Sequence, residues 1–357
     1  MSRKGLAAVA MSGGVDSSVA AALLKEEGYE VIGITMCFNF ACCSRAAIED
    51  ARRVAHKLGI RHYVLNMQKA LDEYVIKDFC RQYLRGRTPN PCVRCNQYIK
   101  FGRLLKKASS LGAKYLATGH YARIEEVHSP QSTVYRKRYL LKKAKDRKKD
   151  QSYFLYRLNQ GQLRQILFPL GNYTKEQVRK LAVKFGLAVA DKPDSQEICF
   201  LPGKDYREFL AGQAKDKIKP GPIVDGQGNI LGEHRGIAFY TIGQRQGLGI
   251  ARGFALYITA IDSRKNQLVA GRKEEAEKSE FLVDKAHFIF KKPKKKIAVK
   301  VKIRYNHQEA SALVWPFGRR WKACFKKPQF AITSGQSAVF YDKEVVLGGG
   351  IINRALE

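Results

Sequence analysis

The residues best suited to phosphate chemistry lie near the start of the chain, in the segment A-M-S-G-G-V-D-S-S at residues 10–18. An apolar run at residues 6–11 predicts a buried strand before it, and residues 17–25 predict a helix that stops at Gly28. Two glycines leave backbone N–H groups unhindered, and three serines add hydroxyls. A turn of this kind at a helix N-terminus favours anions, because the N–H groups and the helix dipole both face the ligand.

The spacing in this segment differs from two common phosphate-binding patterns, G-x-x-x-x-G-K-[ST] and G-x-G-x-x-G. A plain glycine turn would account for Gly13 and Gly14 alone. It would not account for Ser12, Asp16 and Ser17 within the same few residues. The segment therefore predicts a functional anion site.

A second group of reactive residues consists of thiols. Cys92 and Cys95 form a C-x-x-C pair that two prolines precede, and Cys199 follows much later in D-S-Q-E-I-C-F. A C-x-x-C pair by itself fits a redox pair, half a zinc site or part of an iron–sulfur site. The chain has eight cysteines, and in a protein expected in the cytosol this favours metal or redox chemistry over a disulfide framework.

The other cysteines carry weaker expectations. Cys80 falls on an apolar helix face and Cys324 within a predicted strand, so both are expected to pack in the interior. The adjacent Cys42 and Cys43 can hardly share one tetrahedral metal, and the sequence assigns no role to them or to Cys37.

Further polar segments could contact a ligand or RNA. T-G-H-Y at residues 118–121 follows a predicted strand at the carboxyl edge of a sheet, which favours a ligand or nucleic-acid contact for His120 over a place in the core. K-D-Q-S-Y-F at residues 149–154 combines charge, amide and aromatic groups suited to phosphates and bases. The remaining segments, residues 241–249, Arg304–Tyr305 and residues 335–337, fit an ordinary surface equally well.

The first two hundred residues alternate short apolar runs with helical patterns, which predicts an α/β fold with a doubly wound parallel sheet and its ligand at the carboxyl ends of the strands. A further helix is expected at residues 174–186, where a glycine ends it. The expected strands are residues 6–11, 30–35, 62–65 and 115–117, and the expected helices are residues 17–27, 45–58, 70–84 and 99–110.

The pattern changes near residue 206, where glycine and proline become frequent. Regular short strands separated by turns predict a small antiparallel β-barrel in the last part of the chain. The expected strands are residues 255–261, 267–269, 297–304, 310–315, 321–325, 337–340 and 344–348.

Length and composition set limits on the kind of protein. With 357 residues, 45% apolar and 27% charged, the chain fits two or three globular domains. No apolar run is long enough for a membrane span, and the first strand begins too early for a signal peptide, so we expect a cytoplasmic protein. The net charge of +33 favours a polyanionic partner, although a generally basic surface would also explain part of it.

Taken together, these motifs resemble the bacterial tRNA-specific 2-thiouridylases, members of the PP-loop ATP pyrophosphatases. The matching blocks include M-S-G-G-V-D-S-S, G-R-T-P-N-P-C-x-x-C-N, A-T-G-H-Y-A-R, K-D-Q-S-Y-F-L, D-S-Q-E-I-C-F, T-I-G-Q-R-x-G-L-G and G-Q-S-A-V-F-Y followed by L-G-G-G-I-I. The resemblance implies a PP-loop ATP-binding catalytic domain at residues 1–205, a central tRNA-contacting domain at residues 206–277 and a C-terminal β-barrel at residues 278–357.

The resemblance also implies a sulfurtransferase reaction in two steps. ATP with Mg²⁺ adenylates the C2 oxygen of the wobble uridine in tRNA, and sulfur then replaces AMP to give 2-thiouridine; AMP and pyrophosphate are released. By this match the nucleotide is held by Ala10, Met11, Ser12, Gly13, Gly14, Val15, Asp16, Ser17, Met36 and Gly119. The residues implied to face tRNA are Asn90, Pro91, Cys92, His120, Lys149, Asp150, Gln151, Arg304, Tyr305 and Gln336.

One departure from the family pattern bears on how sulfur arrives. Many members carry Asp where this chain has Cys92, and there Cys199 is implied to carry a persulfide that Cys95 resolves as a disulfide. With Cys92, Cys95 and Cys199 all present, the chain instead resembles thiolases that use a 4Fe–4S cluster, and this favours a cluster as cofactor. The persulfide route without metal stays open at this point.

The expected partners follow from the same resemblance. They are the tRNAs for Lys, Glu and Gln and a sulfur donor such as a cysteine desulfurase or a relay protein, with the enzyme acting as a monomer. Two other classes compete with this interpretation. A small-molecule ATP pyrophosphatase, such as argininosuccinate synthase or a GMP synthetase subunit, would not need Cys95 with Cys199, and a zinc-stabilised RNA-binding module would leave residues 12–18 unexplained.

Overall fold

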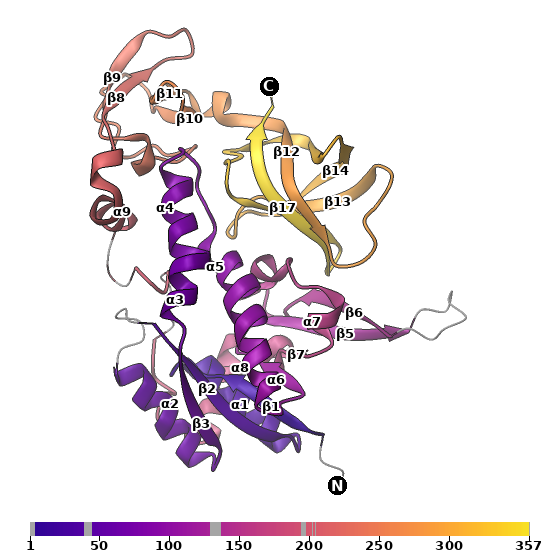
Figure 1. Ribbon diagram of the computed structural model, residues 1–357. Helices are drawn as coiled ribbons and strands as arrows, with labels where there is room; N and C mark the ends of the chain where they lie inside the picture. Colours follow the sequence, from indigo (N-terminus) through magenta and orange to yellow (C-terminus); the bar gives the residue numbers. More distant parts are fainter. Residues whose placement is uncertain are drawn as a thin grey trace. The chain divides into compact units, whose positions relative to one another are not determined.

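The computed structural model describes residues 4–38, 45–128, 137–193, 198–201, 203 and 205–356, and its elements are labelled in Figure 1. Contacts divide the chain into two compact units. The first contains residues 1–74, 92–203 and 344–347, and the second contains residues 75–91, 204–343 and 348–357. Each unit is described by itself.

The first unit is built on a parallel five-stranded sheet with the strand order β3-β2-β1-β4-β7. This order runs outward from β1 in both directions, which confirms the predicted doubly wound sheet. The strands are β1 (Leu6–Ala10), β2 (Glu30–Cys37), β3 (Arg61–Asn66), β4 (Tyr115–Ala117) and β7 (Ile166–Leu167).

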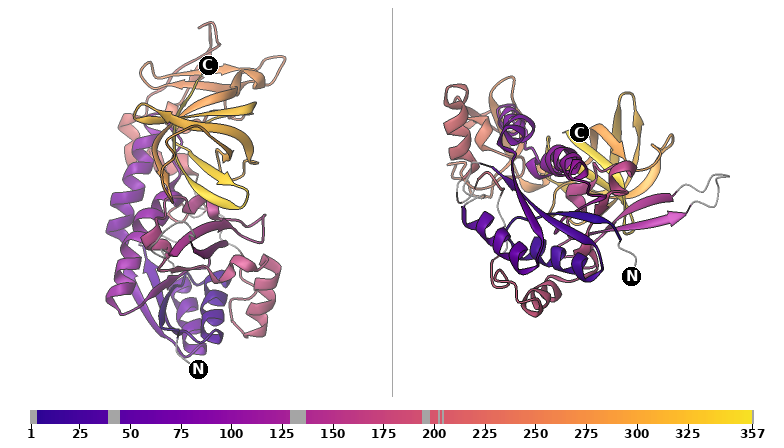
Figure 2. Two further views of the ribbon diagram at one scale, coloured as in Figure 1. Left: turned by 90° about the vertical axis from the view of Figure 1, so that its right-hand side faces the viewer. Right: turned by 60° about the horizontal axis from the view of Figure 1, so that its bottom comes forward.

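Helices pack against this sheet. α1 (Val15–Glu26) contacts β1, β2 and α8 (Lys175–Lys184), and α2 (Arg45–Lys57) contacts β2 and β3. The chain crosses from β3 back over the sheet to β4, and a right-handed crossover of this kind places its helix on the opposite face. That helix contains α6 (Leu105–Ser110), which contacts β4, and Figure 2 shows helices on both sides of the strands.

The apolar residues of α1 explain why it packs here. Val19, Leu23 and Leu24 are buried and lie in one core cluster with Val178 and Ala182 of α8. Burying such side chains stabilises the unit by roughly 1.5–3 kcal/mol each for the larger ones. The helix that carries the glycine–serine turn at its start is therefore firmly held.

The C-x-x-C pair lies inside a helix and not before one. Cys92 belongs to α5 (Pro91–Arg94), and Cys95 begins a π-helical segment, Cys95–Leu104, that continues into α6. Pro91 is well placed in a first helical turn, where its missing N–H has no intrahelical partner to lose. Wide π-helical turns are rare in proteins, and those that occur frequently lie at functional sites.

The first unit also contains a hairpin that the sequence analysis did not predict. It is formed by β5 (Ala122–His128) and β6 (Lys137–Lys143), and Val345 pairs with Lys142 of β6. The smaller elements are the short helix α7 (Gln160–Leu163) and the 3₁₀ turns Ser152–Leu155 and Pro169–Asn172.

The helix predicted at residues 70–84 is a composite. It consists of α3 (Gln68–Leu71), a π-helical turn at Asp72–Ile76 and α4 (Lys77–Tyr83). Cys80 lies half-buried in α4 and Cys324 half-buried in a strand of the second unit, in line with packing roles; Cys42 and Cys43 lie outside the described residues.

The second unit contains a small sheet and a barrel. Helix α9 (Tyr206–Ala214) and two 3₁₀ turns, Lys215–Lys217 and Ile237–Phe239, accompany the sheet, whose strand order is β10-β11-β8-β9. Ile223, Ile258 and Leu268 are fully buried in its own core cluster. The strands are β8 (Gly221–Val224), β9 (Ile230–His234), β10 (Tyr257–Asp262) and β11 (Gln267–Gly271).

The C-terminal strands form an antiparallel barrel, which confirms the sequence prediction. Their order is β12-β15-β14-β13-β16-β17, and pairing of β12 with β17 closes it. Closure removes the exposed edges of an open sheet. After the 3₁₀ turn Lys273–Ala276 the strands are β12 (Glu277–Phe288), β13 (Ile297–Lys302), β14 (Ala310–Phe317), β15 (Arg320–Phe330), β16 (Ser337–Asp342) and β17 (Val345–Ala355).

Among the described residues, no helix is both long and apolar enough to cross a membrane.

Candidate active site

The glycine–serine turn, residues 11–18, joins the carboxyl end of β1 to α1. The Ser12 backbone N–H donates to Ser17 Oγ at 3.1 Å, and the Ser12 and Ser17 hydroxyl oxygens lie 3.3 Å apart. The Ser17 and Ser18 hydroxyls both donate to the Gly14 carbonyl oxygen, at 3.2 and 2.9 Å. Gly14 is the N-cap of α1 and supplies no side-chain cap to the first-turn N–H groups. The turn thus has the local form of an anion site.

Two glycines allow this turn to be so tight. Gly13 has φ +71°, and a Cβ there would lie 2.2 Å from the Ala47 carbonyl oxygen. A Cβ on Gly119, just after β4, would lie 2.8 Å from the Ser17 backbone nitrogen and 3.0 Å from Asp16 Cβ. The structure therefore brings Gly119 against the turn, next to the position expected for a nucleotide.

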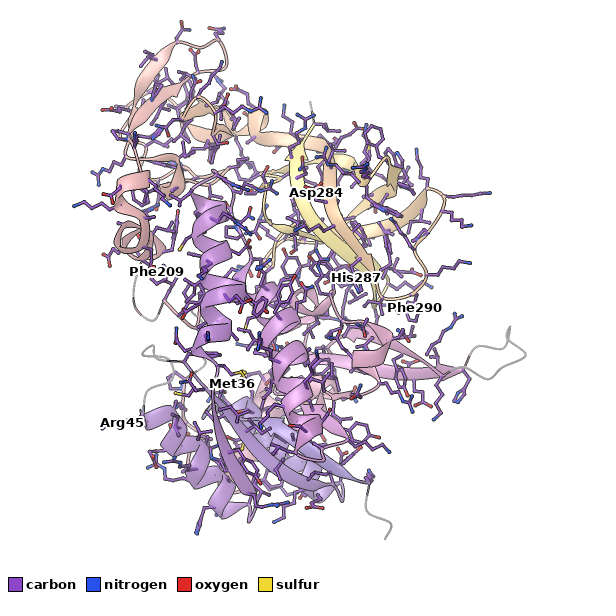
Figure 3. The ribbon with its side chains drawn as sticks, viewed as in Figure 1. Met36, Arg45, Phe209, Asp284, His287 and Phe290 are labelled. Atoms are coloured by element: carbon purple, nitrogen blue, oxygen red, sulfur yellow. The ribbon has the colours of Figure 1, made fainter. Side chains whose placement is uncertain are left out.

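Met36 lies at the end of β2, the strand beside β1 (Figure 3). The Thr35 hydroxyl donates to the Met11 carbonyl oxygen at 2.9 Å, and the Met11 N–H donates to the Ile34 carbonyl oxygen at 2.9 Å. These bonds fix the end of β2 to the start of the glycine–serine turn. The predicted nucleotide residues of β1, β2 and β4 accordingly share the carboxyl edge of the sheet.

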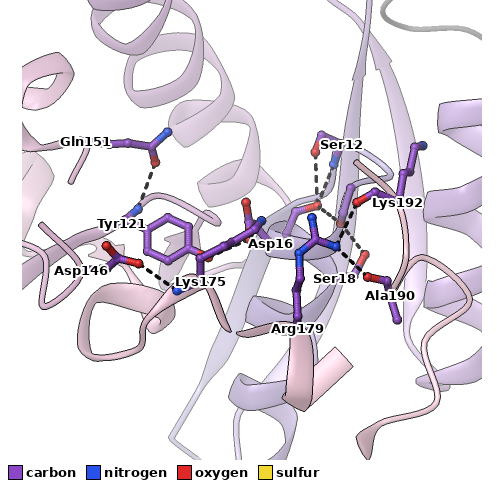
Figure 4. A network of polar contacts seen from close by, with 12 residues as sticks. Ser12, Asp16, Ser18, Tyr121, Asp146, Gln151, Lys175, Arg179, Ala190 and Lys192 are labelled. Atoms are coloured by element: carbon purple, nitrogen blue, oxygen red, sulfur yellow. Dashed lines mark hydrogen bonds and ion pairs between the residues drawn. The ribbon is translucent and has the colours of Figure 1, made fainter. Parts of the chain in front are cut away.

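Asp16 is the charged centre of the turn (Figure 4). Its Oδ1 accepts hydrogen bonds from the Tyr121 hydroxyl at 2.8 Å and from the Lys175 ammonium at 2.7 Å. The Lys175 side chain is only 13% exposed, whereas that of Asp16 is 34% exposed. A cation and a phenol therefore hold the carboxylate at the first turn of α1.

A second lysine contacts the turn from another element. Lys192 Nζ donates to the Gly13 carbonyl oxygen at 2.9 Å and to Asp50 Oδ2 at 2.6 Å. That hydrogen bond, together with the charges of Lys192 and Arg53, lowers the pKa of Asp50 despite partial desolvation. Arg179 of α8 donates to the Lys192 carbonyl oxygen at 3.3 Å, which steadies this segment. Positive charge therefore meets the turn on both sides.

Tyr121 connects the glycine–serine turn to the predicted tRNA-facing segment at residues 149–151. Its backbone N–H donates to Gln151 Oε1 at 3.0 Å, and its carbonyl oxygen accepts from the Gln151 N–H at 2.8 Å. Asp150 is buried and accepts from the Ala144 N–H at 2.9 Å and from the Ser152 hydroxyl at 2.8 Å. Asp150 therefore shapes the segment from inside.

His120 is 8% exposed and lies between aromatic rings. Its ring centroid is 5.8 Å from that of Phe101 and 5.9 Å from that of Phe168, and Nδ1 lies 2.6 Å from Thr118 Oγ1. Desolvation, with a smaller contribution from Lys100, holds the pKa of His120 well below its usual value. A contact of His120 with tRNA stays a prediction.

The three candidate cysteines all belong to the first unit. Cys95 is buried and Cys199 half-buried, whereas Cys92 as a residue is exposed although many protein atoms surround its sulfur. Their electrostatic coupling shows that the thiols are neighbours, because a charge on Cys199 raises the pKa of both Cys92 and Cys95.

Desolvation of the sulfur atoms raises the pKa of Cys92 and Cys95, which favours the protonated thiols. Desolvation, reinforced by Cys199, raises the pKa of Cys92 to about 11, and the charge of Lys100 opposes the rise. Desolvation likewise raises the pKa of Cys95, and Lys100 again acts in the opposite direction. Lys100 is thus the cation best placed to help either thiol become a thiolate.

A 4Fe–4S cluster would require three thiolates that converge on one centre. Within the described ranges, which include all three cysteines, no group of three His, Cys, Asp or Glu side chains is placed to hold a metal ion. As the described residues are placed, the three cysteines therefore do not form a ligand set for a cluster.

In the second unit, three of the sequence motifs meet around Thr88. The Thr88 N–H donates to the Ser334 carbonyl oxygen at 2.8 Å, and the Thr88 carbonyl oxygen accepts from Gln336 Nε2 at 3.2 Å. Thr88 Oγ1 lies 3.0 Å from Thr241 Oγ1, and a Cβ on Gly335 would be 2.9 Å from the Thr88 carbonyl oxygen. The loop that leads to Asn90 and Pro91 is therefore fixed to the segment of Gln336.

Arg304 and Tyr305 follow β13 in the same unit. Arg304 donates to the Phe330 carbonyl oxygen at 3.0 Å, and the Lys302 ammonium lies 5.5 Å from the centre of the Tyr305 ring. Both residues are partly exposed, as an RNA contact requires, and that contact stays a prediction.

The sequence did not indicate Lys175 and Lys192 as parts of the site, and it assigned no role to Tyr121 within the T-G-H-Y segment. The T-K-E-Q stretch at residues 174–177 is a helix-start signal and marks where Lys175 begins its helix. Nothing local, however, indicates that its ammonium reaches Asp16 across 159 residues of chain. Lys192 likewise reaches Gly13 only through the fold.

Comparison with known families agrees with this architecture. Residues 6–203 match the family described as the tRNA methyl transferase HUP domain. Residues 207–272 match the tRNA methyl transferase PRC-barrel domain, and residues 278–352 match the aminomethyltransferase beta-barrel domain.

Solved structures with a partial likeness include two that act on RNA. The U34-tRNA thiolase NcsA from Methanococcus maripaludis with its 4Fe–4S cluster is 18% identical, with a TM-score of 0.35 over 60% of this chain and 68% of that one. A 4-thiouridine synthetase in complex with RNA and ATP is 18% identical, with a TM-score of 0.37 over 60% of this chain and 51% of that one.

Curated relatives match nearly end to end. A tRNA-specific 2-thiouridylase, MnmA 1, from Caldanaerobacter subterraneus is 52% identical over 97% of this chain and 97% of its own. Those from Clostridium acetobutylicum and Halothermothrix orenii are 49% and 51% identical, each over 96% of this chain and 98% of its own. With these matches, and with a phosphate-type turn and the thiols of Cys92, Cys95 and Cys199 in one unit, the chain belongs to the family of tRNA-specific 2-thiouridylases, which are tRNA sulfurtransferases.

Proposed function

We propose that this protein uses ATP to replace the C2 oxygen of the wobble uridine in tRNA with sulfur. The observation that carries the proposal is the glycine–serine turn with Asp16 in the same compact unit as Cys95 and Cys199. The first can bind the phosphates that activate the oxygen, and the second can deliver the sulfur that replaces it.

In the first step ATP binds with Mg²⁺ at residues 10–17, with Met36 and Gly119 beside the nucleotide. The uridine O2 attacks the α-phosphorus, the bond between the α- and β-phosphates breaks, and pyrophosphate leaves. The oxygen, a poor leaving group, becomes part of AMP. The base must be turned out of the anticodon stack, which costs roughly a few kcal/mol and less in a single-stranded loop.

In the second step sulfur attacks C2 and AMP leaves. With a persulfide on Cys199, its outer sulfur forms the bond to C2, which links Cys199 to the base through two sulfurs. The Cys95 thiolate then attacks the Cys199 sulfur, which forms the Cys95–Cys199 disulfide and releases 2-thiouridine. A persulfide donor protein supplies the sulfur, and an external thiol reduces the disulfide by two electrons.

Cys92 distinguishes the two sulfur routes. A cluster held by Cys92, Cys95 and Cys199 would be lost in Cys92→Ala, whereas the persulfide route would keep part of its activity. Iron and acid-labile sulfide are measured after anaerobic purification of the wild type and of this variant. Iron near four per chain in the wild type, lost in the variant together with activity, would contradict the persulfide route.

The family resemblance supplies the residues proposed to hold the tRNA. In the first unit these are His120 and the segment of Lys149, Asp150 and Gln151, and in the second they are Asn90 with Pro91, Arg304 with Tyr305, and Gln336. Asn90, Pro91 and Cys92 face the target base. The net charge of +33 supports the choice of a polyanionic partner. The preferred tRNAs are those for Lys, Glu and Gln, and the enzyme acts as a monomer in the cytoplasm.

The same proposal divides the chain into three domains. These are a PP-loop domain at residues 1–205, a central domain at residues 206–277 and a barrel at residues 278–357. The contacts within the chain support a coarser division into two units. In that division residues 75–91 group with the second unit.

The proposal is tested with the purified protein, an unmodified tRNA transcript with a Lys anticodon, Mg–ATP and a cysteine desulfurase with cysteine. We expect 2-thiouridine in the nucleoside digest and pyrophosphate release that depends on the tRNA. Asp16→Asn should abolish both, while Asp216→Asn, a change at an exposed carboxylate of the second unit, should leave both unchanged. Pyrophosphate release with a small amide acceptor and no tRNA would overturn the proposal.

A further inference from the structure

Lys175 is a cation that the known motifs of the chain do not contain. Its ammonium lies 2.7 Å from Asp16 Oδ1, in the first turn of α1 and next to the glycine–serine turn (Figure 4). Its side chain is only 13% exposed, less than the 34% of its partner Asp16. Lysine side chains are rarely buried to this extent. Desolvating an ammonium is costly, so a buried position beside a phosphate-type turn calls for a role.

The position of Lys175 is set by its backbone and not by flexible packing. Lys175 is the first residue of α8, whose N-cap Thr174 forms a reciprocal capping box with Gln177. Its backbone N–H donates to Asp146 Oδ2 at 2.9 Å. The Cα is therefore fixed, while the flexible four-carbon stem allows the ammonium to change its contacts within its reach.

Asp16 by itself would oppose the ligand expected at this turn. A carboxylate in the first turn of α1 repels a triphosphate, and a magnesium ion that accompanies the nucleotide competes for its oxygens. Without nucleotide, Lys175 neutralises this carboxylate, and the Tyr121 hydroxyl holds it at 2.8 Å. With a magnesium ion bound at the Asp16 carboxylate, the ammonium of Lys175 would lie close to the phosphates and could contact them.

We propose that Lys175 is a phosphate-binding residue of the nucleotide site. Its ammonium moves from the Asp16 carboxylate to the β- and γ-phosphates of Mg–ATP and then binds the pyrophosphate. This inference rests on the proposed use of ATP at the glycine–serine turn. Lys192 is unlike Lys175, since Gly13 and Asp50 already hold its ammonium and Asp50 stays to neutralise it. Lys175 thus supplies charge where the leaving group forms.

The test measures the affinities of Mg–ATP, Mg–pyrophosphate and AMP by titration calorimetry. In Lys175→Met, we expect the first two ligands to bind about 10- to 100-fold more weakly, as for the loss of a charged hydrogen bond, with AMP binding unchanged. Lys175→Arg keeps the charge and should recover most of the affinity. Because this variant also keeps the ion pair with Asp16, its recovery would show that the weaker binding of Lys175→Met comes from the lost charge and not from misfolding.

Lys180→Met is the matched control, since Lys180 lies on the same helix, is 75% exposed and pairs only across the surface with Glu176. It should leave all three affinities unchanged. Equal weakening of AMP and Mg–ATP in Lys175→Met, or no weakening at all while the wild type binds Mg–ATP, would overturn the role of Lys175. A wild type that binds no Mg–ATP would instead overturn the proposed function and this inference with it.

Discussion

Cys92 is an exposed residue, yet the pKa of its thiol is raised. Desolvation and the nearby Cys199 raise its pKa to about 11, and only Lys100 opposes them. The thiolate is the nucleophile in disulfide exchange, so at neutral pH most of the reactive form is missing. The same argument applies to Cys95, whose pKa is raised for the same principal reason.

We therefore predict that alkylation of Cys92 by iodoacetamide is slow at pH 7 and rises about tenfold per pH unit up to about pH 10. Lys100→Met should slow it further, because the charge that favours the thiolate is lost. Lys106→Met, at an exposed position in the same helical stretch, is the control. Mass spectrometry of timed digests gives the rates, and a rate that levels off by pH 8 would contradict the raised pKa.

A second prediction concerns a single residue, Gly119. A Cβ there would lie 2.8 Å from the Ser17 nitrogen, so Gly119→Ala must push the first turn of α1 away from β4. We expect a loss of Mg–ATP affinity of about tenfold or more, since anion binding depends on the aim of these N–H groups. Gly212→Ala in α9, where a Cβ would meet nothing within 4 Å, should leave binding unchanged. Equal affinities in calorimetry would show that the turn can adapt.

At the scale of elements, α8 matters through its first turn. Thr174 Oγ1 accepts from the Gln177 N–H at 3.2 Å, and Gln177 Oε1 accepts from the Thr174 N–H at 2.9 Å. Val178 and Ala182 are fully buried in the core of the first unit. Capping thus sets where the helix starts, and packing sets which way it faces; both are needed to bring Lys175 to Asp16.

We predict that Thr174→Ala lowers the free energy of unfolding of the first unit by about 1 kcal/mol, the usual effect of losing an N-cap. Because α8 then frays at Lys175, Mg–ATP affinity should fall as well. Thr174→Ser keeps the cap and is the control for both measurements. Denaturant unfolding followed by circular dichroism gives the first value, and an unchanged midpoint for Thr174→Ala would rule out the capping argument.

At the scale of the whole molecule, charge dominates. Lys and Arg number 65 against 32 acidic residues, so the chain carries +33 at neutral pH. Each phosphate that a protein neutralises releases counterions from the nucleic acid, and affinity then falls as salt rises. Ion pairs between exposed side chains, such as Lys180 with Glu176, leave this excess unchanged, because both of their charges are already counted in it.

We predict that tRNA affinity falls steeply with salt, by about 10³-fold between 50 and 200 mM if six or more phosphates are contacted. Filter binding of an unmodified transcript measures it. Lys149→Gln should reduce the slope of log affinity against log salt by about one, because one phosphate contact is lost. A flat salt dependence would argue against phosphate contacts as the main source of affinity.

The sequence predicted strands with a regular apolar pattern well and elements without such a pattern poorly. Strand periodicity placed β1, β2, β3 and β4 within two residues of their ends, and the doubly wound order followed from their alternation with helices. The hairpin of β5 and β6 and the long strand β12 were missed, since their charged and mixed residues show no clear apolar period. The helix start at the C-x-x-C pair was placed too late, because two prolines suggested a loop.

The amino-acid sequence determined the parts of this protein that depend on neighbours along the chain. The glycine–serine turn, the C-x-x-C pair and the family could all be recognised, because a tight turn or a helix start needs particular residues at fixed spacing. Only the tertiary structure decided that Lys175 and Tyr121 meet Asp16, and that desolvation raises the pKa of the Cys92 and Cys95 thiols. Charge pairing and desolvation act through space, and the distance in space between two residues is set by the packing of the whole unit.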